Sequence, residues 1–206
     1  MLSEQIVIKK ESQRSLQKED TRRRILDKAA TVFSERGIVE TRSSMVARAA
    51  GVAHGTLFLH FTTQEALITA VIEDFGDGMC RRLHDLSRRG DGIHALLEAH
   101  LQAIAEREDF YVRLVTEASM LPEAARTSLV MIQSTVSFHI TRAAEAGMDA
   151  GRIRRQPVHM LFNTWIGLLH HYLANRELFA PNGRLIGSRG AELLEYFLSL
   201  IEGGSR

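Results

Sequence analysis

The 206-residue sequence predicts an all-α protein. Three features indicate this class: it has only three prolines, its long stretches are built from Ala, Leu, Glu and Arg, and apolar residues rarely alternate with polar ones. The chain is long enough to bury a sizeable core as one large or two small domains. With 45% hydrophobic and 25% charged residues, its composition is that of an ordinary globular protein.

Three features indicate where such a chain resides. Its apolar runs are far shorter than the roughly 20 residues that span a bilayer, and the N-terminal MLSEQIVIKKESQRSLQKED lacks the apolar stretch of a signal peptide. The single cysteine, Cys80, excludes an internal disulfide and argues against a cysteine-based zinc site. We therefore expect a cytoplasmic protein without a membrane partner.

The N-terminal segment divides into an arm and a helix. Residues 1–18 are polar and charged without sustained periodicity, which predicts a mobile basic arm. A helix capped by Asp20 or Thr21 is expected to follow and to end at Gly37. Its apolar residues share one face at helical spacing: Ile25, Leu26, Ala29, Val32 and Phe33.

Two short helices are expected next. Thr41 is a suitable cap for RSSMVARAA, in which Met45, Val46 and Ala49 are expected to face inward. A turn over residues 51–54 then leads to a second short helix over residues 55–61. Two short helices joined by a glycine-containing turn, with a longer helix before them, predict a helix-turn-helix domain over residues 19–65.

The segment AGVAHGTLFLHF, residues 50–61, has two faces. Leu57 and Phe61 lie four residues apart and can anchor the second short helix to the core. The opposite face would carry small polar and aromatic groups that suit a major groove, and the glycine at position 55 would let a phosphate approach the helix N-terminus. A compact helical hairpin that binds no nucleic acid is the alternative, and periodicity alone leaves it open.

Three linked motifs resemble the DNA-binding domain of TetR-family transcriptional regulators: TRRRILDKAATVFSERG, VARAAGVAHGTLFLHF and TTQEALITAVIE. They extend from Thr21 to about Glu73, in the order and spacing of that family. The resemblance implies that Thr41, Arg42 and Ser43 contact DNA phosphates. It also implies that the following residues face the groove or its backbone: His54, Gly55, Thr56, Phe58, Leu59 and His60.

The chain departs from the family pattern at three positions. Ala53 stands where a serine is frequent, Phe58 where a tyrosine is common, and Gln64, which we also expect to contact DNA, where a lysine is common. Each change removes a polar or charged phosphate partner, so we expect DNA binding with a shallow salt dependence. Arg42, Arg48 or the basic arm could compensate; the arm would either enter the minor groove or remain a solvated tail.

From residue 66 onward the sequence predicts a second, larger helical domain. A long helix should begin at the Thr63 cap and end with Arg88, Arg89 and Gly90. Turn-forming segments then divide the remaining chain into further helices, expected over residues 92–106, 109–119, 122–147, 157–179 and 185–202.

The last two predicted helices carry more apolar surface than one core would cover. A helix that is apolar on so much of its circumference must be covered on more than one side. We therefore predict a four-helix seam between two copies of the chain, although a single large core would explain the same pattern. The TetR resemblance also implies a homodimer. The predicted interface consists of Val158, Leu161, Trp165, Leu168, Tyr172, Leu194, Phe197 and Ile201.

An effector chamber is expected between the long helix and that seam. Asn163 could serve as one of its polar anchors, although plain core packing is the alternative for most of the lining. The predicted lining suits a small, mostly apolar ligand and consists of Leu97, Leu101, Ile104, Phe110, Leu114, Met131, Phe138, His139, Phe162 and Trp165.

The motifs together predict a ligand-responsive transcriptional regulator. It would bind an inverted-repeat operator as a homodimer and be released by its effector; repression is the usual direction in the resembled family, and activation stays open. No nucleophile turn, phosphate loop or metal-ligand spacing is present, so we expect no enzyme, no cofactor and no metal site. The alternative is a protein of another class: a helical small-molecule-binding protein, or an enzyme, whose helix-turn-helix domain has lost DNA binding.

Overall fold

A computed structural model describes residues 2–181 and 183–203, with residues 2–12 as backbone alone. All of the regular structure in these residues is helical, which confirms the predicted class. An isolated antiparallel bridge pairs Ile153 with Glu202. The helices are α1 (Leu2–Arg36), α2 (Ser43–Ala49), α3 (His54–His60), α4 (Gln64–Arg89), α5 (Ile93–Glu106), α6 (Glu108–Glu117), the 3₁₀ helix η1 (Ala118–Met120), α7 (Glu123–Asp149), α8 (Val158–Ala174), α9 (Arg176–Phe179) and α10 (Leu185–Ile201).

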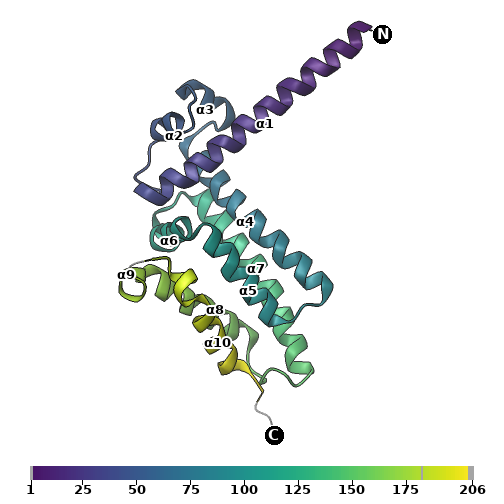
Figure 1. The fold of residues 1–206 in the computed structure, drawn as a ribbon, viewed down its shortest axis with the longest axis vertical. Helices are drawn as coiled ribbons and strands as arrows, with labels where there is room; N and C mark the ends of the chain where they lie inside the picture. Colours follow the sequence, from purple (N-terminus) through teal and green to yellow (C-terminus); the bar gives the residue numbers. More distant parts are fainter. Residues whose placement is uncertain (1, 182, 204–206) are drawn as a thin grey trace.

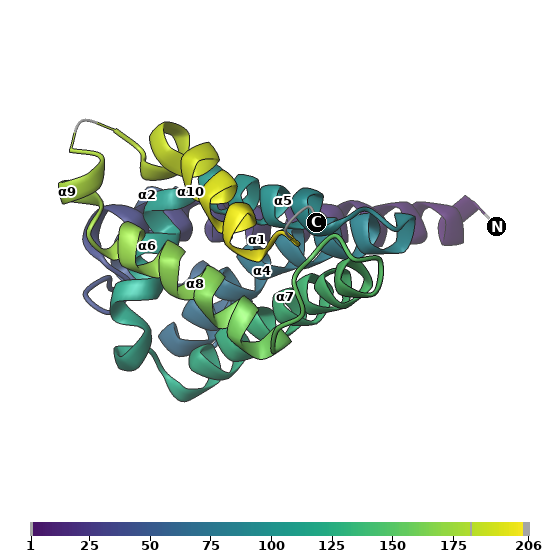
Figure 2. The ribbon, with the colours of Figure 1, turned by 90° about the horizontal axis from the view of Figure 1, so that it is seen from below.

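The helices form a small N-terminal lobe above a larger bundle. Figure 1 shows α1, α2 and α3 together at one end, with α4, α5 and α7 running side by side beneath them and α8 and α10 along the bundle. Viewed from below in Figure 2, α8 and α10 lie in front of the other helices, while α1 extends behind them to the right. No helix within the described residues has the length and apolar character needed to cross a membrane.

The first helix is much longer than expected. We predicted a start at Asp20 or Thr21 after an arm without regular structure, but α1 is continuous from Leu2 to Arg36. Thr21 is an interior residue whose hydroxyl donates to the Gln17 carbonyl at 2.8 Å. The extension is rich in Glu, Gln, Lys and Arg, which are good helix formers, and contains no glycine or proline.

The long linking helix follows the sequence prediction closely. The Thr63 hydroxyl accepts a hydrogen bond from the Ala66 N–H at 3.0 Å and thereby caps α4. At the other end Gly90 adopts the left-handed conformation, with φ of 78°. That conformation suits glycine and stops the helix after Arg89.

One prediction failed in the C-terminal half. The single helix expected over residues 157–179 is broken at Asn175 into α8 and the short α9. The Asn175 backbone has φ of −112° and ψ of 29°, and its side-chain amide donates to the His171 carbonyl at 2.8 Å. This local side-chain bond competes with continuation of the helix, as asparagine often does.

A buried core runs from α1 to α10. Phe33 and Phe110 stack with ring centroids 6.5 Å apart, where α1 meets α6. Trp165 of α8 is fully buried, with its ring centroid 5.0 Å from that of Phe197 on α10. The two lobes therefore pack directly on one another, and α6 lies at their junction.

Candidate nucleic-acid interface and effector cavity

The turn between α2 and α3 has the form that the sequence predicts. Gly51 adopts a left-handed conformation with φ of 63°, and the Val52 N–H donates to the Ala47 carbonyl at 3.0 Å. A side chain at position 51 would strain this backbone, so glycine sets the angle between the two short helices. The inward face of α2 differs from expectation, because Ala49 is exposed while Ala47 and Ala50 are buried.

Helix α3 presents one face to the core and the other to solvent. Leu57 is fully buried and Phe61 nearly so, as the four-residue spacing predicted. On the outward side His54 and Gly55 are exposed, and Leu59 is 80% exposed. This leucine gives the outward face of α3 an apolar group among polar ones.

Polar and aromatic side chains accompany Leu59 on this face. Thr56 is half-buried beside it. The rings of His54 and Phe58 meet edge to face with centroids 4.9 Å apart. This packing fixes both rings on the surface that would meet base edges or phosphates.

The structure contradicts the expected roles of Thr41. Its hydroxyl donates to the Gly37 carbonyl at 2.6 Å, and the residue is only 1% exposed, so the side chain is unavailable to a phosphate. It is also not the cap of α2, since Arg42 occupies that position without a side-chain capping bond. Thr41 instead closes the turn between α1 and α2.

Gln64 holds the start of α2 in place. Its amide nitrogen donates to the Thr41 carbonyl at 2.8 Å, and its amide oxygen accepts from the Ser43 N–H at 3.3 Å. The Ser43 hydroxyl in turn lies 3.2 Å from Nε2 of His54 on α3. Gln64 thereby positions the start of α2. The fact that the resembled family commonly has a lysine at this position does not indicate such a role.

His60 lies at the corner between α3 and α1. It is half-buried, and its Nδ1 has no hydrogen-bond partner among the described residues. Burial lowers its pKa, and the nearby charges of Lys18 and Arg22 lower it further. The Arg22 guanidinium also lies 5.1 Å from the centre of the Phe61 ring. His60 thus lies at the edge of the outward face rather than at its centre.

A cavity of about 290 Å³ opens between α6, α7 and α8. It contains no formal charge, because burial lowers the pKa of His170 and the other lining residues are uncharged. The Tyr111 hydroxyl and Nε2 of His170 lie 3.0 Å apart at its wall. The lining consists of Tyr111, Leu114, Val115, Ala118, Leu129, Gln133, Ile166 and His170.

A second hollow lies deeper in the bundle. Its free volume of about 10 Å³ is at the lower limit for one water molecule. Tyr111, Leu129, Gln133 and Ile166 line both spaces, so the hollow continues the cavity inward toward His100. The two spaces together form one mostly apolar site with a few polar groups.

Most of the predicted chamber residues lie elsewhere. Leu114 is the predicted residue that lines the cavity, whereas Met131 and Phe138 are 65% and 54% exposed on the surface. Asn163, the proposed polar anchor, is also exposed. The remaining predicted residues are buried in the core: Leu97, Leu101, Ile104, Phe110, His139, Phe162 and Trp165.

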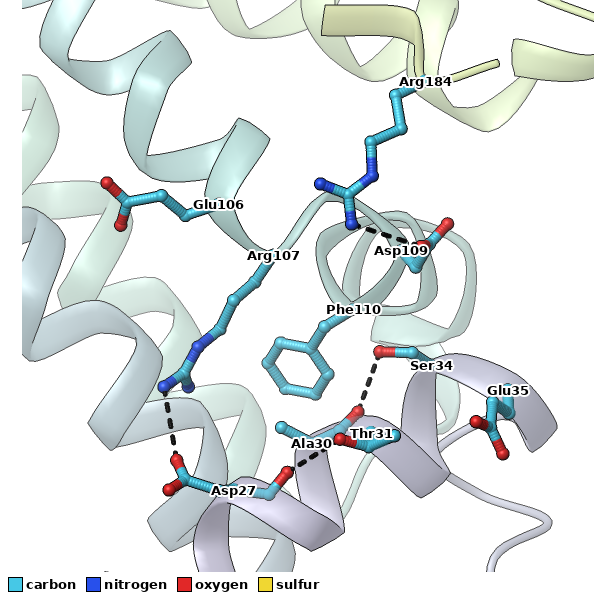
Figure 3. Close-up of a pocket in the computed structure, with 10 residues that line it drawn as sticks. All are labelled: Asp27, Ala30, Thr31, Ser34, Glu35, Glu106, Arg107, Asp109, Phe110 and Arg184. Atoms are coloured by element: carbon cyan, nitrogen blue, oxygen red, sulfur yellow. Dashed lines mark hydrogen bonds and ion pairs between the residues drawn. The ribbon is translucent and has the colours of Figure 1, made fainter. Parts of the chain in front are cut away.

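A third space of about 300 Å³ lies where the two lobes meet. Figure 3 shows Phe110 facing α1, with Arg107 reaching toward Asp27 and Arg184 toward Asp109. Arg107 also pairs with Asp74 of α4 at 2.9 Å. These ion pairs make the cleft a cross-linked junction between the lobes.

The predicted dimer residues fall into two groups. Leu161, Trp165, Leu194, Phe197 and Ile201 are at most 6% exposed within the single chain, so they already belong to its own core. Val158, Leu168 and Tyr172 are half-buried. Large apolar side chains that remain exposed on α8 and α10 are Met160, Tyr196 and Leu200.

The N-terminal part of the chain is similar in sequence to known transcriptional regulators. Residues 25–71 match the family model described as bacterial regulatory proteins, tetR family. The HTH-type transcriptional repressor KstR2 of Rhodococcus jostii is 34% identical over 82 residues, which is 40% of this chain and 40% of that protein. The similarity to this curated relative therefore spans less than half of its length.

Solved structures resemble the chain over a longer span. The regulator FadR from Bacillus subtilis, in complex with stearoyl-CoA, aligns with a TM-score of 0.72 and 18% identity over 85% of this chain and 97% of that one. A regulator from Saccharomonospora viridis in complex with choline aligns with a TM-score of 0.73 and 18% identity over 91% of this chain and all of that one. At these identities the likeness establishes the fold.

The fold and the outward face of α3 define an all-helical protein with an N-terminal helix-turn-helix domain and a larger helical domain. The family model matches the helix-turn-helix segment and the start of α4. In this segment the chain is similar to bacterial regulatory proteins of the tetR family.

Proposed function

We propose that this chain is a ligand-responsive transcriptional repressor that binds an inverted-repeat operator as a homodimer. The observation that carries the proposal is the outward face of α3, where Leu59 is 80% exposed beside Thr56 and the ring pair of His54 and Phe58. A helix of this kind, anchored through its other face, fits the major groove. The name of the KstR2 relative supports repression as the direction.

In the proposed complex the contacts on α3 divide into two kinds. Thr56 and Leu59 would touch base edges, since a threonine or leucine methyl suits the thymine methyl. Arg42, Ser43 and His54 would contact phosphates and fix the register of the helix. The bonds from Gln64 to the start of α2 would hold Ser43 in position for that contact.

The proposed dimer would form through the outer faces of α8 and α10. Met160, Tyr196 and Leu200 are 55%, 56% and 41% exposed there, and Leu168 borders the face. Because the bulk of the predicted seam is already buried within one chain, the second copy would cover these outer residues. The two helix-turn-helix domains of such a dimer would recognise two half-sites of the operator.

The cavity is the proposed effector site. Its volume of about 290 Å³ suits a small molecule, and its uncharged lining favours a neutral ligand. The Tyr111 hydroxyl, the Gln133 amide and the His170 imidazole would supply its hydrogen bonds. The effector class that follows is a small, mostly apolar, uncharged molecule with one or two polar groups.

Helix α6 would carry the effector signal to the DNA-binding lobe. One of its faces supplies Tyr111, Leu114 and Val115 to the cavity. At its C-terminal end, the Glu117 carboxylate accepts hydrogen bonds from the Ile38 and Val39 N–H groups at 2.8 and 3.0 Å. Any displacement of α6 by a ligand would therefore act on the connection between α1 and α2.

The other end of α6 is fixed to the C-terminal helices. The Glu108 carboxylate accepts hydrogen bonds from the N–H groups of Leu185 and Ile186 at 2.7 and 2.9 Å, at the start of α10. Two buried carboxylates thus tie α6 to the proposed dimer helix and to the DNA-binding lobe. A ligand would shift the balance between bound and released states by its preference for one of them.

Selection of duplexes from a random pool by the purified protein, without added ligand, tests the proposal. Enrichment of an inverted repeat by the wild-type chain would support both sequence reading and two-fold assembly. A Thr56→Ala, Leu59→Ala variant should lose this enrichment while remaining folded and dimeric. A folded wild-type protein that enriches no sequence, even after extraction of bound small molecules, would refute the proposal.

A further inference from the structure

The inner face of α1 changes character along the helix. In the body of the lobe, Ile25, Ala29 and Phe33 are buried on this face. Toward the N-terminus the same face continues at helical spacing with Arg22, Lys18 and Arg14. An apolar stripe that packs on the lobe thus becomes a basic stripe beyond it.

The basic stripe starts beside the recognition helix. Arg22 lies over the ring of Phe61, and the charges of Lys18 and Arg22 act on His60 at the end of α3. Glu19 also acts on His60 with the opposite sign. Figure 1 shows α1 passing α3 and projecting well beyond the lobe. Arg14 and Lys18 of α1 are exposed.

We propose that Arg14, Lys18 and Arg22 bind the phosphates of the DNA that flanks the half-site read by α3. This inference rests on the proposed function, because it takes the position of the duplex from α3. The charge of this part of α1 favours a polyanion such as DNA as the partner, because residues 13–24 contain five basic and two acidic residues. The position of the stripe favours the same partner, since the stripe begins with Arg22 and Lys18 beside the C-terminal end of α3.

The spacing of the stripe suits a phosphate backbone. Residues four apart in a helix are separated by about 6 Å along its axis, so the three basic side chains span about 12 Å. Flexible lysine and arginine side chains can follow successive phosphates over such a length and carry no sequence preference. The stripe would extend the footprint of each helix-turn-helix domain without altering its specificity.

The test uses the full chain and the selected operator in two lengths, one ending at the half-sites and one with ten further base pairs on each side. An Arg14→Ala, Lys18→Ala variant is compared with an Arg23→Ala, Arg24→Ala variant, which removes the same charge from exposed positions on other faces of α1. Circular dichroism and sedimentation check that both variants remain helical and keep the wild-type assembly. Binding is measured between 50 and 200 mM salt.

For the longer duplex we expect the stripe variant to lower the salt slope by about 1.8, since each lost phosphate contact contributes about 0.9. Between those salt concentrations the wild-type chain would then lose about twelvefold more affinity than the variant. On the short duplex the two proteins should differ little, and the control variant should follow the wild type on the long one.

Three other results are informative. Equal slopes for the stripe variant and the wild type on the long duplex would overturn the inference. An equal loss on both duplexes would also overturn it, because the contacts would then lie within the half-site. If the wild-type chain selects no operator at all, the proposed function itself fails, and the inference fails with it.

Discussion

Trp165 donates its indole N–H to Nδ1 of His100 across 3.1 Å, and this bond joins α8 to α5 inside the core. His100 is 2% exposed and Trp165 is fully buried. Burial, with a smaller contribution from His170, lowers the pKa of His100 to about 3. Protonation of Nδ1 would also remove the acceptor of the indole bond, so the folded protein holds this imidazole neutral.

The first prediction concerns stability against pH. The pKa of His100 lies below its unfolded value of about 6.5, so its contribution to stability is complete above that pH and is lost as the pH falls toward about 3. From pH 6.5 to 5, His100 should remove about 2 kcal/mol from the free energy of unfolding. Urea unfolding at both pH values measures the loss, and His100→Gln should make it smaller. An unchanged pH dependence in that variant would contradict the assignment.

The second prediction concerns the carboxylates at the two ends of α6. Glu117→Gln should weaken the acceptor of the Ile38 and Val39 N–H groups, and amide hydrogen exchange should become faster over residues 37–41. A buried N–H that loses its partner costs about 1–3 kcal/mol. The matched variant Glu108→Gln should instead speed exchange near Leu185 and Ile186. Identical exchange patterns in the two variants would argue against local anchoring.

The third prediction distinguishes a role of α3 side chains in DNA recognition from a role in the fold. Thr56→Ala should weaken binding to the selected operator by about 5- to 150-fold, the range for a base contact worth about 1–3 kcal/mol. Binding to unrelated DNA should change little. His60→Ala should also weaken specific binding. The exposed Thr62, just beyond the helix, offers Thr62→Ala as a control for both. A Thr56 variant that is monomeric or unfolded would show that the residue is structural.

The fourth prediction concerns assembly. Leu168→Glu places a charge at the border of the outer face of α8, and Met160→Glu places one at a position that is 55% exposed within the single chain. If this face covers a second copy, both variants should sediment as monomers, because an unpaired buried charge is costly. Because Met160 is exposed in the single chain, Met160→Glu should not disturb the fold, so loss of the dimer in this variant would not result from misfolding. Dimers in both cases would show that the chosen face is wrong.

The local elements were predictable from the sequence, because short-range rules determine them. The Thr63 cap, the stop at Gly90 and the anchoring pair Leu57 and Phe61 all depend on neighbours within one helical turn. The start of α1 was not predicted, although it too depends on local sequence. A polar segment without periodicity suits a mobile arm as well as an exposed helix, and the residues concerned are good helix formers.

The sites that depend on long-range packing were less predictable. Met131 and Phe138 have helical spacing, yet their faces of α7 point to solvent, because a sequence does not say which helix covers which stripe. Gln133 and His170 line the cavity and lack any motif that would have marked them. The bond from Glu117 to Ile38 joins residues 79 positions apart, and no pattern in the sequence signals it.

Gly37, where α1 ends, has φ of +93°, and a Cβ there would lie 2.9 Å from a carboxylate oxygen of Glu117. Glycine at this position therefore lets the Glu117 carboxylate lie against the end of α1, and beyond it α1 is one continuous helix from Leu2 to Arg36. Arg14 lies 23 residues away, or about 35 Å along the helix, so a tilt of about 10° would carry it through about 6 Å. That displacement equals the spacing between neighbouring basic residues of the stripe. In the proposed complex, a small rotation of the lobe would therefore displace the N-terminal part of α1 by more than it displaces α3, which lies nearer to Gly37.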